Sequence, residues 1–303
     1  MYEFILHLLI FTGIFIILAA SCDLILGYAG MYQMGHGAFY AIGAYSAALI
    51  ALHWHWPFYL EFLASGLFAG IVGALFAASM VRANADYFSL ATFGLAVVTF
   101  TVLMTWDSVT RGPLGITGIP GINIFGLSIV TGLKFLILTA LITAATIYLL
   151  YLLVHSPFGR ALKAMREDEI ATLASGRNTP MMKVVAYGIG TMFAGFAGNL
   201  YAHYISFIDP TTFSINISIL VLCMVVIGGM GTLKGPVIGA FLLFIIPELL
   251  RFLGLPATTG GLIRQLIYGV VLVVMQAWNP RGLMGIKLPL SFTKIRPGHK
   301  EIA

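Results

Sequence analysis

Charged residues are scarce in this sequence. Asp, Glu, Lys and Arg make up 9% of its 303 residues, against roughly 25% in soluble domains, and 60% are hydrophobic, against roughly 45–50%. A soluble globule of this length needs a charged surface, which so few ionisable residues cannot supply. The composition, with a mean hydropathy of +0.99, therefore excludes a single soluble domain and predicts an integral membrane protein.

Cysteine is rarer still, with two residues in the chain. Cys22 and Cys223 lie in apolar segments far apart in the sequence, which offers neither a disulfide framework nor a metal site. We expect both thiols to be buried and to act as small apolar groups. A Gly-x4-Gly-Lys-Ser/Thr phosphate loop is also absent, so we expect no ATP hydrolysis, no cofactor and no metal in this chain.

Long apolar runs make up most of the chain. Runs of about 18 to 24 residues match the roughly 20 residues that a helix needs to cross a bilayer. They predict an all-α integral membrane fold, a polytopic bundle of about eight to ten transmembrane helices in a single domain, residues 1–303. The nine expected spans are Phe4–Ser21, His36–Leu52, Phe58–Val81, Tyr87–Trp106, Thr131–Val154, Lys183–Phe207, Ser214–Met230, Pro236–Leu253 and Gly261–Trp278.

Lys and Arg in the connecting segments predict the orientation. The basic interval at about 156–180 and the tail at about 279–303 are expected to be cytoplasmic. Alternation of the nine spans then places twelve Lys and Arg residues inside and four outside, with the turn around Trp54 outside. The net charge of +5 therefore reflects topology, and we expect no nucleic-acid partner.

Ionisable side chains are nearly absent from the span interiors, which argues against a proton-coupled transporter. His36 and His203 are the nearest candidates, and each is expected to form a hydrogen bond within the bundle. The charged residues that do occur in the expected spans lie near the predicted outer ends of those spans: Glu61, Lys134, Glu248, Arg251 and Arg264.

Small residues recur every four positions in two spans. Gly66 and Gly70 share a helix face, as do Gly190, Ala194 and Gly198. In lipid, such faces let helix backbones approach closely, so we expect a tightly packed bundle.

The basic interval contains two helix signatures. Ser156 followed by Pro157 is typical of a helix start, and Asp168 and Gly176 are suited to begin and end a second short helix. Such a pair presents a surface to another protein or is a solvated loop with helical content. The local pattern alone leaves both readings open.

The same interval resembles the coupling loop of ABC-importer permeases, because Glu169-Ile170-Ala171-Thr172 with Gly176 matches a Glu-Ala-Ala…Gly pattern, with Thr172 in place of the second Ala. Residues 156–169 resemble the LivM-type permeases of branched-chain amino acid importers. The resemblance extends over nearly the whole chain, through residues 26–30, 35–39, 43–45, 87–92, 183–187, 194–204 and 226–240.

The resemblance implies one permease subunit of an importer in the bacterial cytoplasmic (inner) membrane, surrounded by lipid. Its partners would be a second LivH-like permease, two ATP-binding subunits that use ATP and Mg, and a periplasmic or lipid-anchored solute-binding protein, with a small-molecule amino acid as substrate. Open alternatives are an ABC permease for urea, another amino acid or a small organic acid, and a secondary transporter or channel that acts alone. The residues implied in coupling to the ATPase are Arg160, Arg166, Glu169, Ala171 and Gly176.

Two glycine-rich pieces interrupt apolar runs, at residues 27–30 and 228–231, and each precedes a Gly- and Ala-rich helix. Such paired interruptions are typical of repeat halves whose broken helices line a solute path. Alternatively, the glycines only permit tight turns and packing. The candidate pathway residues are Gly27, Tyr28, Gly30, Gln33, His36, Gly229 and Gly231.

Overall fold

The computed structural model of the protein describes residues 2–124, 127–129 and 132–251, together with positions 266, 269, 270, 273 and 282–284. The ninth expected span, residues 261–278, and the tail, residues 279–303, lie almost wholly outside the described residues. The same is true of Arg264 and of the side chains of Glu248 and Arg251.

Helices form where the apolar runs predict them. Each of the first eight expected spans is a helix whose ends differ from the expected ones by at most four residues. These helices are α1 (Tyr2–Asp23), α2 (His36–His53), α3 (Phe58–Met80), α4 (Ala85–Thr105), α6 (Leu133–His155), α9 (Thr179–Ile205), α10 (Ile215–Gly228) and α11 (Lys234–Arg251).

Length and composition agree with a membrane location. Among the described residues, five helical segments are long and apolar enough to cross a bilayer, namely Tyr2–Tyr28, Phe58–Met80, Ala85–Thr105, Leu133–His155 and Thr179–Ile205. Two further apolar helices, Ile215–Gly228 and Lys234–Phe244, are shorter. The expected polytopic helical membrane fold is confirmed.

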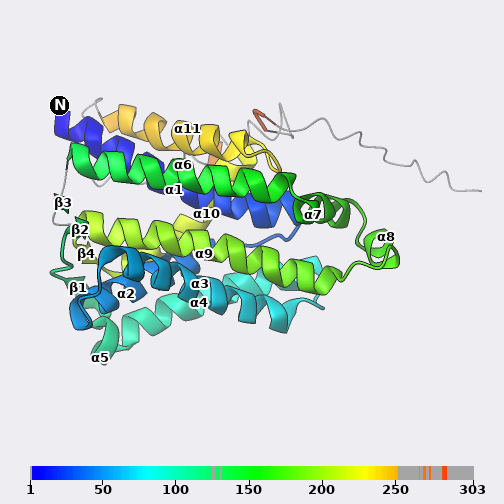
Figure 1. Ribbon diagram of the computed structural model, residues 1–303, viewed down its shortest axis with the longest axis horizontal. Helices are drawn as coiled ribbons and strands as arrows, with labels where there is room; N and C mark the ends of the chain where they lie inside the picture. Colours follow the sequence, from blue (N-terminus) through cyan, green and yellow to red (C-terminus); the bar gives the residue numbers. More distant parts are fainter. Residues whose placement is uncertain are drawn as a thin grey trace, which may run out of the picture.

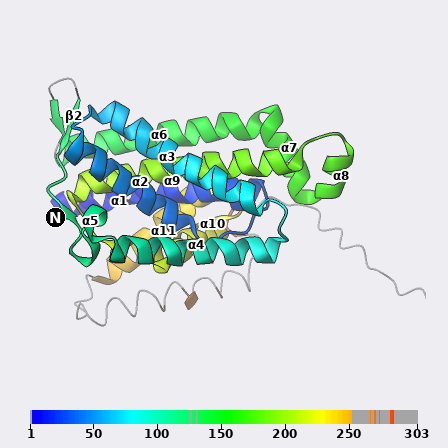
Figure 2. The same cartoon turned by 90° about the horizontal axis from the view of Figure 1, so that it is seen from below.

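The bundle has two distinct ends (Figure 1). At one end, here called the strand end, lie the N-terminus, the short helix α5 (Asp107–Thr110) and four short strands. At the opposite end, the coupling end, lie α7 (Pro157–Glu167) and α8 (Glu169–Ala174), and Figure 2 shows the same separation from a second direction. The turn from α2 to α3 lies near the strand end, so the two loops expected on opposite sides of the membrane do lie at opposite ends.

The apolar runs do not predict the short strands. Strand β1 (Ile116–Thr117) pairs with β4 (Phe207–Ile208), and β2 (Ile122–Ile124) pairs with β3 (Leu127–Ile129), both antiparallel. A 3₁₀ turn, η2 (Gly112–Leu114), precedes β1. Contacts of η2 with α4, of β2 with α3 and of β4 with α9 hold these elements at the strand end of the bundle.

A second 3₁₀ turn, η3 (Pro210–Phe213), follows β4 and is capped by Asp209. Asp209 Oδ1 accepts a hydrogen bond from the Thr212 backbone N–H at 3.0 Å. Burial acts to raise the pKa of Asp209, but this bond and those from Thr211 together hold its pKa below the usual value. Asp209 therefore serves the turn as a carboxylate.

Helix α9 lies at the centre of the bundle and packs against α2 and α3 (Figure 1). The small residues make these contacts close. A Cβ placed on Gly70 of α3 would lie 3.0 Å from the Gly188 carbonyl of α9, and one placed on Gly198 of α9 would overlap the Tyr40 carbonyl of α2. The expected close approach of helix backbones is thus confirmed.

Helix α1 is also part of the packed core. Its residues Ile10, Ile14, Ile17 and Leu18 are fully buried, and it contacts α6, α9, α10 and α11. It continues into one turn of π-helix, η1 (Leu24–Tyr28), where the first glycine-rich break begins. Cys22 and Cys223 are buried and form no disulfide, as expected.

Candidate functional site

The two glycine-rich breaks, more than 200 residues apart in sequence, meet in the structure. The backbone N–H of Gly231, beyond the end of α10, donates a 2.7 Å hydrogen bond to Asp23 Oδ1 at the end of α1. Gly27 lies against both partners, since a Cβ there would overlap the Asp23 carboxylate and the Gly231 nitrogen. Only a glycine at position 27 allows this approach.

Arg166 of α7 lies against the same two breaks. Its Nη1 donates a hydrogen bond to the Gly27 carbonyl. A Cβ on Gly231 would lie 2.7 Å from Nη1, and one on Gly30 would lie 2.9 Å from Arg166 Cγ. The resemblance assigns Arg166 to coupling, the paired interruptions predict that the glycines line the solute path, and the structure brings the two sets together.

A second basic residue of α7 faces η1. Lys163 Nζ lies 5.1 Å from the centroid of the Tyr28 ring, within the roughly 6 Å range of a cation–π contact. Lys163 and Arg166 are three positions apart and therefore share a helix face. Arg160, by contrast, is exposed and donates to the carbonyl of His155, the last residue of α6, at 2.9 Å.

Asp23 is the site residue that sequence reasoning missed. Its side chain is fully buried, and its Oδ2 has no hydrogen-bond partner within the described residues. The available signal was a lone carboxylate at the end of the first apolar run, because ionisable residues within membrane spans mark functional positions. The expectation that the span interiors are nearly free of ionisable groups therefore needs correction here.

Gln33 and His36 form a hydrogen-bonded group beside this contact. The Gln33 Nε2 lies 3.0 Å from His36 Nδ1, and His36 Nε2 lies 2.9 Å from Ser21 Oγ, which donates to the Leu18 carbonyl. A neutral imidazole with its proton on Nε2 satisfies every bond in this chain. His36 thus bonds within the bundle, as expected.

Further hydrogen bonds fix the chain around the second glycine-rich break. The N–H of Gly37, in the first turn of α2, donates to Ser218 Oγ of α10 at 2.9 Å. Leu283 and Met284 donate their N–H groups to the Ile227 and Gly228 carbonyls, both at 2.9 Å, and so satisfy carbonyls at the end of α10.

The seven candidate pathway residues consequently lie in a closed arrangement. Gly30 is half-buried and the other six are buried: Gly27, Tyr28, Gln33, His36, Gly229 and Gly231. Beside them, at the coupling end, a cavity of about 600 Å³ opens between the turn after α3 and the α7–α8 pair. Its lining joins Gly30 and Arg166 to Glu169 and Lys183.

Helix α8 projects from the bundle (Figure 1). The expected caps are present: Asp168 Oδ1 accepts from the Ala171 N–H at 2.9 Å, and Ser156 Oγ accepts at the start of α7. Gly176 follows α8 with a φ of +83°, as a helix-ending glycine does. This geometry favours a rigid helix pair over a solvated loop.

The outer face of α8 is apolar and uncovered in the described structure. Ile170 is 80% exposed and Leu173 is 54% exposed, and Ala171 is exposed between them. Glu169 holds the helix to α9 through a two-oxygen contact with Lys183 Nζ, at 2.6 and 2.7 Å. Four of the five expected coupling residues therefore lie on the exposed part of the loop, and Arg166 is the one that points inward.

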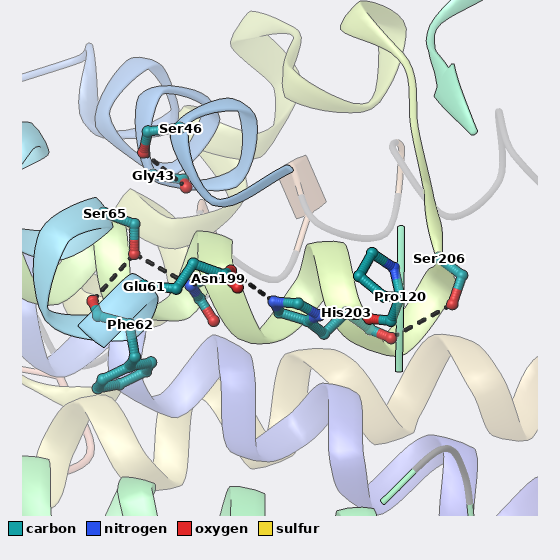
Figure 3. Close-up of polar contacts among 9 residues, drawn as sticks. All are labelled: Gly43, Ser46, Glu61, Phe62, Ser65, Pro120, Asn199, His203 and Ser206. Atoms are coloured by element: carbon teal, nitrogen blue, oxygen red, sulfur yellow. Dashed lines mark hydrogen bonds and ion pairs between the residues drawn. The ribbon is translucent and has the colours of Figure 1, made fainter. Parts of the chain in front are cut away.

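A separate buried polar group lies toward the strand end (Figure 3). His203 Nε2 of α9 lies 2.6 Å from Glu61 Oε1 of α3, and its Nδ1 lies 2.8 Å from the Pro120 carbonyl. Because a carbonyl can only accept, Nδ1 carries a proton, and another proton lies between Nε2 and Glu61. Asn199 also donates to Glu61 and to Ser65, both at 3.1 Å. His203 thus bonds within the bundle, as expected, and Glu61 is its buried partner.

His203→Ala is expected to lower the free energy of unfolding by about 3–5 kcal/mol, because it leaves the buried Glu61 without its partner. The more exposed pair of Glu169 and Lys183 offers a matched control: Glu169→Gln removes the negative charge from this contact and should cost no more than about 1 kcal/mol. Detergent-solubilised protein unfolded by heat or by a denaturing surfactant gives the comparison. Equal stability of the two variants would contradict the burial argument.

The sequence of this chain is similar to those of known transport permeases. Residues 4–276 match a family model described as branched-chain amino acid transport system / permease component. The chain is 33% identical, over 92% of its own length and 69% of the relative's, to the high-affinity branched-chain amino acid transport system permease protein LivM of Escherichia coli (strain K12).

More distant relatives include a probable branched-chain amino acid transport permease protein LivM of Methanocaldococcus jannaschii, 26% identical over 74% of this chain and 67% of the relative. They also include the autoinducer 2 import system permease protein LsrC of Yersinia pseudotuberculosis serotype O:1b, 26% identical over 70% of this chain and 58% of the relative. No solved structure matches the chain.

Proposed function

The chain belongs to the family of branched-chain amino acid transport permeases, and from that premise we propose that it forms half of the solute path of an ABC importer in the bacterial inner membrane. The observation that carries the proposal is the continuous contact from the exposed helix α8 through α7 to both glycine-rich breaks. A permease needs such a connection because its energy source lies outside the membrane.

The proposed partners follow from the surfaces of the chain. Two exposed apolar side chains on the projecting polar segment, Ile170 and Leu173, support docking of α8 in a groove of an ATP-binding subunit. That subunit would hydrolyse ATP with Mg. This chain would have no enzyme activity of its own. A second, LivH-like permease would complete the path. A solute-binding protein would deliver solute at the strand end.

The proposed solutes are leucine, isoleucine and valine. Support comes from the relatives, two of which are described as branched-chain amino acid permeases and match most of this chain. Relatives described as permeases for autoinducer 2 make the solute a question for direct measurement, with urea, other amino acids and small organic acids as competitors.

Uptake of labelled leucine tests the solute class. Cells that lack this chain should take up leucine slowly, and the cloned chain should restore the rate. A hundredfold excess of unlabelled isoleucine or valine should suppress the restored uptake, whereas urea should not. Restored uptake that urea suppresses, or no restoration at all, would contradict the branched-chain assignment.

The proposed orientation is tested with single cysteines after Cys22 and Cys223 are replaced by Ala. A cysteine at His53, beside the outer turn, should react with an impermeant maleimide added to intact spheroplasts. A cysteine at Arg177, an exposed residue after α8, should react only after permeabilisation. The reverse pattern would invert the proposed topology.

A further inference from the structure

We propose that Arg166 is the positioning residue that links the coupling helices to the inner closure of the solute path, with Asp23 as its alternative acceptor. The inference deepens the proposed function and rests on it. Arg166 is thus assigned to contact within this chain and not to the surface of an ATP-binding subunit.

The contacts of Arg166 and Asp23 converge on the same two backbone segments. Arg166 Nη1 donates to the Gly27 carbonyl and lies against Gly231. Asp23 accepts from the Gly231 N–H at 2.7 Å and lies against Gly27. Both side chains therefore fix the position of η1 relative to the turn after α10.

A guanidinium suits this position for two reasons. It carries five N–H donors in a planar fork, so one side chain can serve several backbone carbonyls of broken helices. It also brings a cation to the two backbone segments that the buried Asp23 contacts, and a buried carboxyl group without a nearby partner is costly. Lys at position 166 offers the charge without the fork.

The path from the docking surface to this contact is short and rigid. Asp168 is at once the residue that ends α7 and the cap that begins α8, so the two helices are joined without a flexible linker. Leu162 and Met165 of α7 are buried and anchor this helix in the bundle. A displacement of α8 must therefore move Arg166, only two residues before Asp168.

The buried contact between the two glycine-rich breaks also contains one hydrogen-bond acceptor without a donor. Asp23 Oδ2 is buried and accepts no hydrogen bond within the described residues. When α7 moves, the guanidinium must leave the Gly27 carbonyl, and Asp23 provides a second acceptor in the same cluster. The Arg166 guanidinium thus has two alternative acceptors, the Gly27 carbonyl and Asp23 Oδ2. A coupled gate requires two such alternative states of the protein.

The test uses the complete complex reconstituted in proteoliposomes, with the number of ATP molecules hydrolysed per solute imported as the main readout. Arg166→Gln is expected to raise this ratio on the order of tenfold, as the loss of a typical coupling between sites does. Asp23→Asn should raise it similarly. Glu167→Gln, at an exposed residue of the same helix, is the matched control and should leave the ratio unchanged.

A second readout separates coupling from folding. In a background with Cys22 and Cys223 replaced by Ala, a cysteine at Met230 beside the closure should react with a maleimide at a rate that depends on bound nucleotide. Arg166→Gln should remove this dependence while the subunits still purify together. Arg166→Lys should retain part of it, because the charge remains.

Three results would overturn the inference. One is a wild-type ratio and normal nucleotide dependence in Arg166→Gln. Another is an additive effect of Asp23→Asn and Arg166→Gln in the double variant, since partners in one contact are not additive. The third is loss of assembly in both Arg166→Gln and Arg166→Lys, which would assign a structural role. If variants of α8 uncouple the complex while Arg166 variants do not, the proposed function stands and this inference falls.

Discussion

Gly176→Val is expected to reduce ATP hydrolysis by the assembled importer to its unstimulated rate, with loss of solute uptake. Gly176 adopts a φ of +83° immediately after α8, a conformation that costs a residue with a side chain about 1–3 kcal/mol. Val is among the least suited, because it is branched at Cβ. The strain would displace the end of α8, and the membrane bundle would still fold because a Cβ on Gly176 meets nothing within 4 Å.

Ala171→Glu should have the same effect by a different route. Ala171 is exposed between the apolar side chains of Ile170 and Leu173. A Glu side chain at this position would be too large for a partner groove, and its carboxylate would have to lose its hydration to enter. The fold of α8 should persist, since Glu favours a helix. Each variant is measured by solute-stimulated ATP hydrolysis in proteoliposomes.

Arg177→Ala, an exposed neighbour in the same loop, is the control for both variants and should behave as wild type. Normal stimulation and normal uptake with both Gly176→Val and Ala171→Glu would show that α8 is not the docking element. Equal losses in Arg177→Ala would point to the whole loop rather than to the capped helix.

Gly198→Leu is expected to prevent the bundle from folding. A Cβ at Gly198 would overlap the Tyr40 carbonyl and crowd the Ala44 nitrogen of α2, and backbone atoms cannot rotate away as a side chain can. Overpacking of a core by side-chain atoms costs about 1–3 kcal/mol, and a clash with helix backbone should exceed that range. The measurement is the yield of monodisperse protein after solubilisation from the membrane.

Gly94→Leu provides the matched control for this change. Gly94 lies in α4, and a Cβ there meets nothing within 4 Å, so the larger side chain has room. Gly is about 0.8–1.0 kcal/mol less favourable than Ala in a helix interior, and Leu ranks just below Ala. We expect normal or raised yield from Gly94→Leu, and equal loss in the two variants would contradict the packing of α2 on α9.

The membrane-length helices and the short helix α8 could be predicted from the sequence because their signals are local. An apolar run of membrane length becomes a helix whatever surrounds it, and Asp168 and Gly176 bound α8 through bonds to their own neighbours. The close contact of α9 with α2 and α3 could be predicted for a similar reason, since small residues every four positions mark one helix face.

The contact between the two glycine-rich breaks could not be predicted, because it depends on residues far apart in sequence. The sequence indicates that Gly27 and Gly231 each interrupt a helix, but nothing local states that one lies on the other. Arg166 shares this difficulty. Its position within a basic loop suggests a partner protein, whereas the fold turns its side chain toward η1.

Buried charges were the other gap in the sequence-based prediction. Asp23 lies at the end of an apolar run and Glu61 near the start of one, positions where side chains commonly reach the membrane surface. Both are buried instead, Asp23 by the turn after α10 and Glu61 by His203. Whether a side chain at the end of a span is buried depends on the helices and turns that pack against it. The spacing of residues within one apolar run does not reveal these neighbours.

Leucine uptake into proteoliposomes tests the central claim most directly. We expect uptake only when this chain is reconstituted with the second permease and the ATP-binding subunits, supplied with ATP on the side of α8 and with binding protein on the side of the strand end. Omission of ATP or of either partner should reduce uptake to that of empty vesicles. Leucine uptake by this chain alone, without ATP, would contradict the account.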